Sequence, residues 1–378
     1  MARTVASLQS RRRSARRYTM LVLLVLALFA GWTGLWKFAA GKAEETLNGW
    51  RAREAKEGHA YACGTQTIGG FPFRIEVDCD QASAVFRGSE PPFAIKTSRI
   101  LLAAEVYRPT VLTGEFTGPL TVADPGQPPA FTANWRQGHV SLYGTPASPE
   151  QVSLTFEGPS VDRVAGGAHE NLLSARLVDF TGRLAGGSVH DKPVIELSLR
   201  LERGSLPVVH PAATAPINAD IAALLRGLKD FDPKPWPQRF REIQAANGRI
   251  DISRARVQQG ETIAVGTGSL SITANGNLQG QLRVTVAGLE PFLNAIGAQH
   301  MVQNSRDMDK LAGMLDRFAP GLGEVARQQA GANLSAGINL LGEQTTLEGK
   351  RAVALPLRFE DGAVFLGPIP IGRTPALF

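Results

Sequence analysis

The strongest constraint on this chain is a run of 19 residues without a charge, YTMLVLLVLALFAGWTGLW, at positions 18–36. As an α-helix the run would be about 29 Å long, close to the hydrocarbon thickness of a bilayer. Tyr18, Trp32 and Trp36 stand near its ends, where aromatic side chains favour the membrane interfaces. The run therefore predicts a transmembrane helix. The alternative is a cleaved signal peptide, which leads to the same compartment.

The excess positive charge lies before this run. Residues 1–17 carry six arginines and no acidic residue, and the rest of the chain carries 34 basic and 34 acidic residues. By the positive-inside rule, the basic tail predicts a cytoplasmic N-terminus and an exported main domain. A balanced body without a basic stripe argues against a nucleic-acid partner.

Beyond the run, residues 42–57 are highly charged and place Ala43, Leu47 and Trp50 at helical spacing, which predicts a short stalk helix. The sequence thus divides into a cytoplasmic basic tail at 1–17, a transmembrane helix at 18–36, a juxtamembrane stalk helix at 37–58 and an exported β-rich domain at 59–378.

Cys63 and Cys79 are the chain's two cysteines, and they enclose 15 residues that include the turn sequence Gly-Gly-Phe-Pro-Phe. Residues 73–77 alternate between apolar and charged side chains, so a hairpin here would bring the two thiols together. In an oxidising compartment such a pair is usually a disulfide. A catalytic thiol or half of a metal site has less support, because there is no C-x-x-C motif.

The body of the chain is dominated by alternation with a period of two, as in VIELSLRL at 194–201 and QLRVTVAGL at 281–289. Asn275-Gly276 and Asp361-Gly362 stand between such runs and favour tight hairpins. Pro356 lacks an amide donor, which predicts an edge strand at its position. We therefore expect a mainly β fold with minor α: large antiparallel twisted sheets covered by a few amphipathic helices, plus the N-terminal transmembrane helix.

Three segments carry a single apolar stripe at helical spacing and predict those amphipathic helices: 217–228, 235–248 and 305–318. They would pack on the β core; alternatively, some would cover a ligand groove or lie on the membrane. FDPKPWP at 231–237 is rich in proline and aromatic residues and predicts a boundary between two β-rich lobes.

No residue cluster in the sequence identifies a reaction. The six histidines are far apart and form no H-x-x-x-H or H-E-x-x-H motif, so no metal site is predicted. A P-loop, a G-x-S-x-G elbow and a complete G-x-G-x-x-G are lacking, so no cofactor is predicted either. We expect a protein that is not an enzyme and has no catalytic, cofactor-binding or metal-binding residues.

The stretch GFPFRIEVDC at 70–79 and the C-terminal LPLRFEDGAVFLGPIPIG at 355–372, taken with the anchor, resemble a bacterial family of unknown function, domain of unknown function 2125. The resemblance assigns no activity to any residue and implies a β-rich protein of the bacterial envelope. With the anchor, it predicts a single-pass inner-membrane protein with a periplasmic main domain. At the level of the fold, the chain also looks like AsmA-like envelope proteins, which are elongated β structures implicated in lipid transport.

Two functions follow as hypotheses. The first is binding or transfer of lipid, or of another apolar envelope component, along a sheet with one apolar face. The alternative is a non-enzymatic structural or assembly scaffold that binds envelope proteins. An open apolar face favours the first hypothesis, and a face closed by the protein's own helices favours the second. Protein partners and oligomeric state are not predicted.

Overall fold

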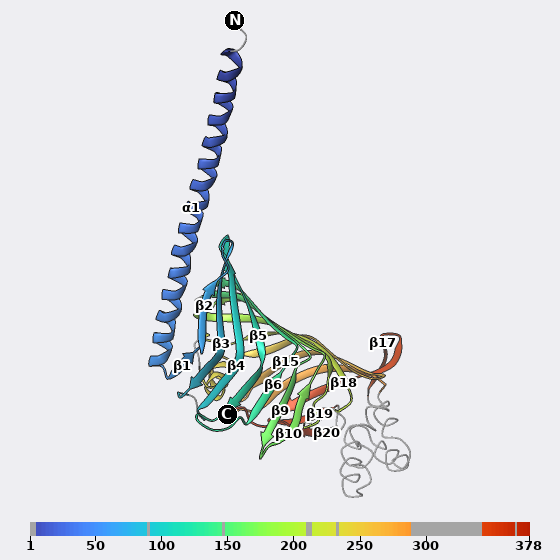
Figure 1. Cartoon of the computed structure of the whole chain (residues 1–378). Helices are drawn as coiled ribbons and strands as arrows, with labels where there is room; N and C mark the ends of the chain where they lie inside the picture. Colours follow the sequence, from blue (N-terminus) through green and yellow to red (C-terminus); the bar gives the residue numbers. More distant parts are fainter. Residues whose placement is uncertain are drawn as a thin grey trace, which may run out of the picture.

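The computed structural model describes residues 5–88, 91–145, 148–208, 214–231, 234–288, 342–366 and 369–378. Within these residues the chain forms two helices and one antiparallel sheet of 20 strands (Figure 1). The expected mainly β class, with antiparallel sheet structure and an N-terminal apolar helix, is confirmed.

The two helices are α1 (Val5–Lys56) and α2 (Trp236–Ala245). The strands of the first half are β1 (His59–Ala62), β2 (Thr65–Gly69), β3 (Arg74–Phe86), β4 (Phe93–Glu105), β5 (Arg108–Ala123), β6 (Phe131–Asn134), β7 (Gln137–Thr145), β8 (Ser148–Glu157), β9 (Ser160–Ala165) and β10 (Ala168–Ser174). Those of the second half are β11 (Leu177–Ser188), β12 (Asp191–Gly204), β13 (Ile217–Arg226), β14 (Arg249–Gln259), β15 (Thr262–Ile272), β16 (Leu278–Ala287), β17 (Glu343–Leu347), β18 (Lys350–Glu360), β19 (Ala363–Leu366) and β20 (Ile369–Arg373).

The strands follow one another across the sheet almost in chain order. β1 and β2 both pair with β3, β3 pairs with β4, and β4 with β5. From β11 to β16 each strand pairs with the next, and β16 then pairs with β18. After β5, three successive positions in the sheet are each occupied by two short strands that follow one another along the chain. These are β6 with β7, β8 with β9, and β10 with β11. Such a meander follows from hairpin connections between neighbouring strands.

A line of interruptions crosses the first half of the sheet. The breaks between β6 and β7, β8 and β9, and β10 and β11 fall at residues 135–136, 158–159 and 175–176. On neighbouring strands, the register of β4 against β5 shifts between Thr97 and Arg99. Trp135 lies at this line, packs on Phe156 with ring centroids 5.0 Å apart, and donates its indole N–H to the Phe116 carbonyl. Bulges and breaks of this kind let a long sheet bend.

Several local predictions are confirmed. The run 194–201 lies within β12, and 281–287 lies within β16. Asp361 and Gly362 form the two-residue turn between β18 and β19, with φ of 48° and 81° as a type I′ turn requires. Asn275-Gly276 also joins two paired strands, although the loop there spans 273–277 and is longer than the tight turn expected.

Of the three predicted amphipathic helices, the one at 235–248 is confirmed as α2 and the one at 217–228 is wrong. The latter segment is β13, which pairs with β12 and β14 on its two sides. Apolar residues four positions apart, such as Ile217, Ile221 and Leu225, share a face in a helix and also in a strand, because four is a multiple of two. The segment hydrogen-bonds to strands on both sides, so it is a strand and not a helix. The predicted helix at 305–318 lies outside the described residues.

Two further predictions are corrected by the pairing. The segment 231–237 does not separate two sheets, because β13 before it pairs directly with β14 after it. β18 is not an edge strand, since β16 lies on one side and β17 and β19 lie on the other. Pro356 faces the gap between β17 and β19, so its missing amide donor breaks no pairing there.

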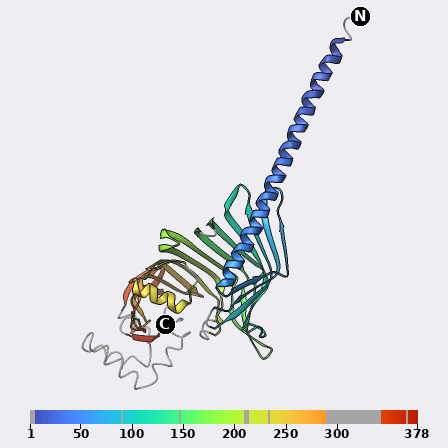
Figure 2. The same ribbon diagram turned by 90° about the vertical axis from the view of Figure 1, so that its left-hand side faces the viewer.

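The transmembrane and stalk segments predicted separately form one continuous helix, α1. Its part from Tyr18 onward is long and apolar enough to cross a membrane, with a mean hydropathy of 2.0 in its most apolar window, and that window is not buried in the protein. The C-terminal part of α1 runs beside the β1–β3 end of the sheet (Figures 1 and 2). There Trp50 packs on Tyr61, with ring centroids 4.6 Å apart.

Ion pairs hold the β17–β18 hairpin to strands far away in the sequence. Arg256 on β14 forms two bonds to Glu348 in the β17–β18 turn, at 2.7 and 2.8 Å, and Lys350 pairs with Glu261 in the β14–β15 turn. The Arg256 hydrogen bond lowers the pKa of Glu348, and the Lys350 hydrogen bond lowers that of Glu261.

The sign of both pKa shifts predicts that this hairpin loosens in acid. A carboxylate whose pKa is lowered on folding stabilises the fold above its unfolded pKa, near 4.5, and this stabilisation is lost as the pH falls through the folded pKa. We expect protection of the β17 amides against hydrogen exchange, relative to the β12 amides, to stay constant from about pH 7 to about pH 5 and to fall as the pH drops below about 4.5. A Glu261→Gln/Glu348→Gln variant should show reduced protection already at neutral pH and little further change. Equal pH dependence in the parent and the variant would contradict the assignment.

Candidate functional site

The central strands present apolar side chains on one face and polar side chains on the other. On β12, Leu197, Leu199 and Leu201 alternate with Ser198 and Arg200. Directly paired residues of antiparallel strands lie on the same face. The pairing can therefore be used to follow each face from strand to strand.

A row of paired residues crosses twelve strands through Leu199 without meeting a polar side chain. In order from β3 to β18 it consists of Val77, Leu102, Gly114, Val140, Leu154, Phe180, Leu199, Ile221, Ala255, Gly266, Val284 and Leu355. At a strand spacing of about 4.8 Å the row is about 50 Å long.

Two parallel rows flank it on the same face. One runs from Cys79 on β3 through Leu201 on β12 to Val353 on β18, and the other from Ile75 through Leu197 to Leu357. Neither row contains a hydrophilic side chain. Cys79, at the start of the first row, is part of the disulfide and carries no free thiol. We call the surface formed by these three rows the apolar face.

The opposite face of the sheet is covered with ion pairs. Arg183 bonds Glu196 on neighbouring strands, and Arg254 bonds Asp220 at 2.7 Å. Asp78 accepts hydrogen bonds from Arg99, which lower the pKa of its carboxyl group. Charged side chains of this kind are stable in contact with water. With one apolar face and one charged face, the sheet is amphipathic over its length.

The apolar face is only partly buried along its middle. Phe180, Leu199 and Ile221 are half-buried, whereas Leu355 at the β18 end is 3% exposed. A sheet face packed against a second layer normally buries such side chains. The middle of the apolar face therefore keeps apolar surface accessible in the structure.

Helix α2 covers the edge of the apolar face next to Leu197. Ile243 of α2 forms a buried cluster with Ile195 and Leu228, and Phe240 packs against the same cluster. Figure 2 shows α2 on the inner side of the curved sheet. The apolar face thus lies between α2 along one edge and the line of interruptions at Trp135 along the other.

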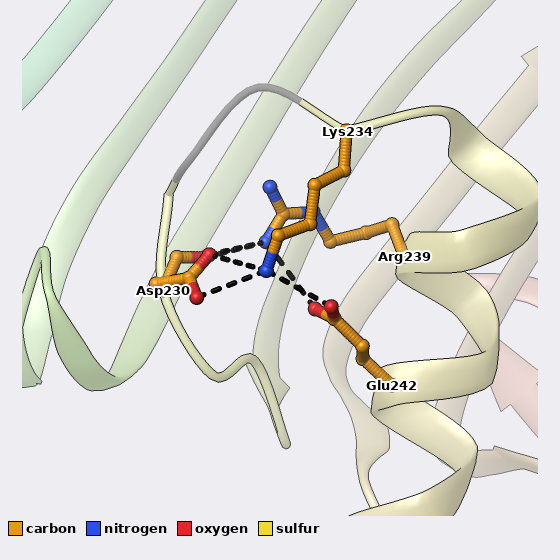
Figure 3. A network of polar contacts seen from close by, with 4 residues as sticks. All are labelled: Asp230, Lys234, Arg239 and Glu242. Atoms are coloured by element: carbon orange, nitrogen blue, oxygen red, sulfur yellow. Dashed lines mark hydrogen bonds and ion pairs between the residues drawn. The ribbon is translucent and has the colours of Figure 1, made fainter.

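A polar network fixes α2 in this position. Figure 3 shows Lys234 between Asp230 and Glu242, with Nζ 2.9 Å from a carboxylate oxygen of each. Arg239 of α2 donates to the carbonyl of Asp230 at 2.5 Å. The hydrogen bonds of Glu242 and Asp230 raise the pKa of Lys234. Asp230 and Arg239 are both largely buried, and each has a second partner of opposite charge, Lys234 for Asp230 and Glu242 for Arg239.

The predicted cysteine pair lies at the first edge of the sheet. Cys63 and Cys79 are joined in a disulfide with their Cα atoms 5.4 Å apart. Cys63 stands between β1 and β2, so the bond holds the interrupted edge strand against β3. Arg51 of α1 donates to the Cys63 sulfur at 3.3 Å.

Within the described part of the chain, Glu54, Glu57 and His59 bring metal-ligating atoms close together at the junction of α1 and β1. His59 Nδ1 lies 2.9 Å from Glu54 Oε2, and Glu57 is exposed. This is a hydrogen-bonded contact at the junction of α1 and β1, remote from the apolar face in the sheet.

Sequence reasoning recognised single alternating strands and missed their alignment into rows. The alternation of apolar and polar residues predicts each strand, but the register between two strands cannot be derived from the sequence of either strand alone. The family model described as "Uncharacterized protein conserved in bacteria (DUF2125)" matches residues 36–375, in agreement with the resemblance stated above. The search of curated proteins finds no match to the chain.

Proposed function

Because the chain belongs to the DUF2125 family of uncharacterized bacterial proteins, whose description assigns no activity, we propose its function from the apolar face. The protein binds lipid, or another apolar component of the bacterial envelope, and passes it along the three rows. It acts as a carrier and not as an enzyme. The observation that carries this proposal is the uninterrupted apolar face, which stays half-buried through the middle of the sheet.

The dimensions of the apolar face suit an extended hydrocarbon chain. Neighbouring rows lie two residues apart along each strand, or about 7 Å, so three rows span about 14 Å. Each methylene group removed from water contributes about 0.8 kcal/mol, so a dozen of them would contribute about 10 kcal/mol before the entropic cost of association. A polar headgroup could remain in water beyond the rows.

The proposed cellular setting follows from the N-terminus and the cysteines. The apolar part of α1 anchors the protein in the inner membrane as a single span, and the six arginines before it keep the N-terminus in the cytoplasm. The Cys63–Cys79 disulfide supports a periplasmic location for the sheet, because such bonds persist in oxidising compartments.

The proposal is tested with a photo-crosslinking amino acid placed at Leu199 in the full-length protein, in living bacteria. Leu199 lies at the centre of the apolar face, and Ser198, its exposed neighbour on the opposite face, is the matched control position. We expect irradiation to attach phospholipid or another apolar envelope molecule at position 199 and not at 198, detected by mass spectrometry. Absence of such an adduct at 199 in folded protein would overturn the carrier function. A protein adduct there would support the scaffold alternative instead.

A further inference from the structure

A loop of the sheet packs against the membrane end of α1. The indole N–H of Trp32 donates to the Pro72 carbonyl at 2.8 Å, and that of Trp36 donates to the Arg74 carbonyl at 2.8 Å. Phe71 lies between Phe29 and Trp36, with ring centroids 6.1 and 5.5 Å away. The loop at residues 70–73, between β2 and β3, is therefore attached to the last two turns of the apolar run.

These contacts define the depth of the loop in a membrane. The apolar run 18–36 has the length of the hydrocarbon core, so Trp32 and Trp36 fall at one of its two boundaries. A loop bonded to both indoles lies at the same boundary. The C-terminal part of α1 contacts β1, β2 and β3 and so runs along the sheet (Figure 1).

The surface around this loop has the composition of a membrane interface. Phe73 and Tyr107 are each 63% exposed, and the hairpin turn that carries Tyr107 is joined to the loop by the bond from Val106 N–H to the Phe73 carbonyl, 2.9 Å. Arg74 and Arg108 are exposed beside them. Exposed aromatic rings flanked by arginines fit the boundary between acyl chains and anionic headgroups.

The apolar face begins immediately behind these loops. Ile75, the first residue of its outer row, follows Arg74 on β3, and Ala104, its partner on β4, precedes Glu105. We propose that the loops at 70–73 and 105–108 insert into the leaflet next to the sheet, and that the apolar face takes up lipid from this leaflet. The uptake step rests on the proposed function, whereas insertion of the loops stands without it.

Insertion is tested on the full-length protein in vesicles of phosphatidylethanolamine and phosphatidylglycerol. A fluorescent amino acid replaces Phe73 or Tyr107, and Phe131, an exposed aromatic residue paired with Val122 at the far end of β5, is the control position. We expect lipids brominated on their acyl chains to quench the fluorophore at 73 and 107 and to leave that at 131 unchanged. Equal fluorescence with and without bromine at 73 and 107 would overturn the insertion.

Uptake is tested by combining a Phe73→Asp/Tyr107→Asp variant with the photo-crosslinker at Leu199. Both side chains are mostly exposed, so the variant should keep the disulfide and resist protease as the parent does. We expect it to lose most of the lipid adduct, while a Phe131→Asp control keeps it. An undiminished adduct would overturn uptake at these loops. If the parent protein gives no lipid adduct, both the carrier function and the uptake are overturned. The insertion of the loops is tested independently by the quenching at positions 73 and 107.

Discussion

Replacing Leu199 by aspartate is expected to abolish lipid binding at the centre of the apolar face. The carboxylate would stand in the middle row, flanked by Phe180 and Ile221 on the neighbouring strands. A charged side chain in contact with hydrocarbon costs about 2.5–3.5 kcal/mol, which corresponds to binding about a hundredfold weaker. The measurement is the yield of lipid adduct at a photo-crosslinker placed at Ile221.

A Ser198→Asp variant is the matched control for this experiment. Ser198 is the preceding residue of the same strand, exposed on the ion-paired face, so its carboxylate should remain in water. We expect it to keep the adduct yield of the parent. Similar losses in both variants would indicate a general effect on folding, and no loss in Leu199→Asp would contradict the expected contact between the bound hydrocarbon and position 199.

Removal of the disulfide should give the largest loss of stability. In the chain-entropy account, a cross-link that encloses 15 residues stabilises a fold by about 3 kcal/mol, because it restricts the unfolded chain. The Cys63→Ser/Cys79→Ser variant is therefore expected to unfold at lower urea concentration, with its free energy of unfolding reduced by about this amount. The measurement is tryptophan fluorescence of the detergent-solubilised protein across a urea series.

Treatment of the parent protein with a reductant is the control for the double variant. Reduced parent protein should unfold at the same urea concentration as the double variant, and the double variant should not respond to reductant. Disruption should begin at the first edge of the sheet, where Gly64 donates to the Asp80 carbonyl at 2.9 Å beside the disulfide. A variant as stable as the oxidised parent would contradict the prediction.

The amphipathic sheet also explains why local patterns alone were misleading at two points. At 217–228 the apolar spacing fits a helix and a strand equally, and only the pairing of β13 with β12 and β14 decided for the strand. At 231–237 the prolines suggested a boundary, although β13 before this segment pairs directly with β14, and residues 236–237 already belong to α2. In both cases hydrogen bonding between strands outweighed local propensity.

Features that depend on neighbouring residues could be predicted from the sequence: the apolar helix through 18–36, the alternation in β12, and the turn at Asp361-Gly362. The sequence also pointed to the pairing of Cys63 with Cys79. The alignment of twelve strands into continuous apolar rows, and the attachment of the 70–73 loop to Trp32 and Trp36, are properties of the folded chain and could not be predicted in this way. Periodicity and turn chemistry act over a few residues. Register is different, because it is set by hydrogen bonds and burial summed between strands that lie far apart along the chain.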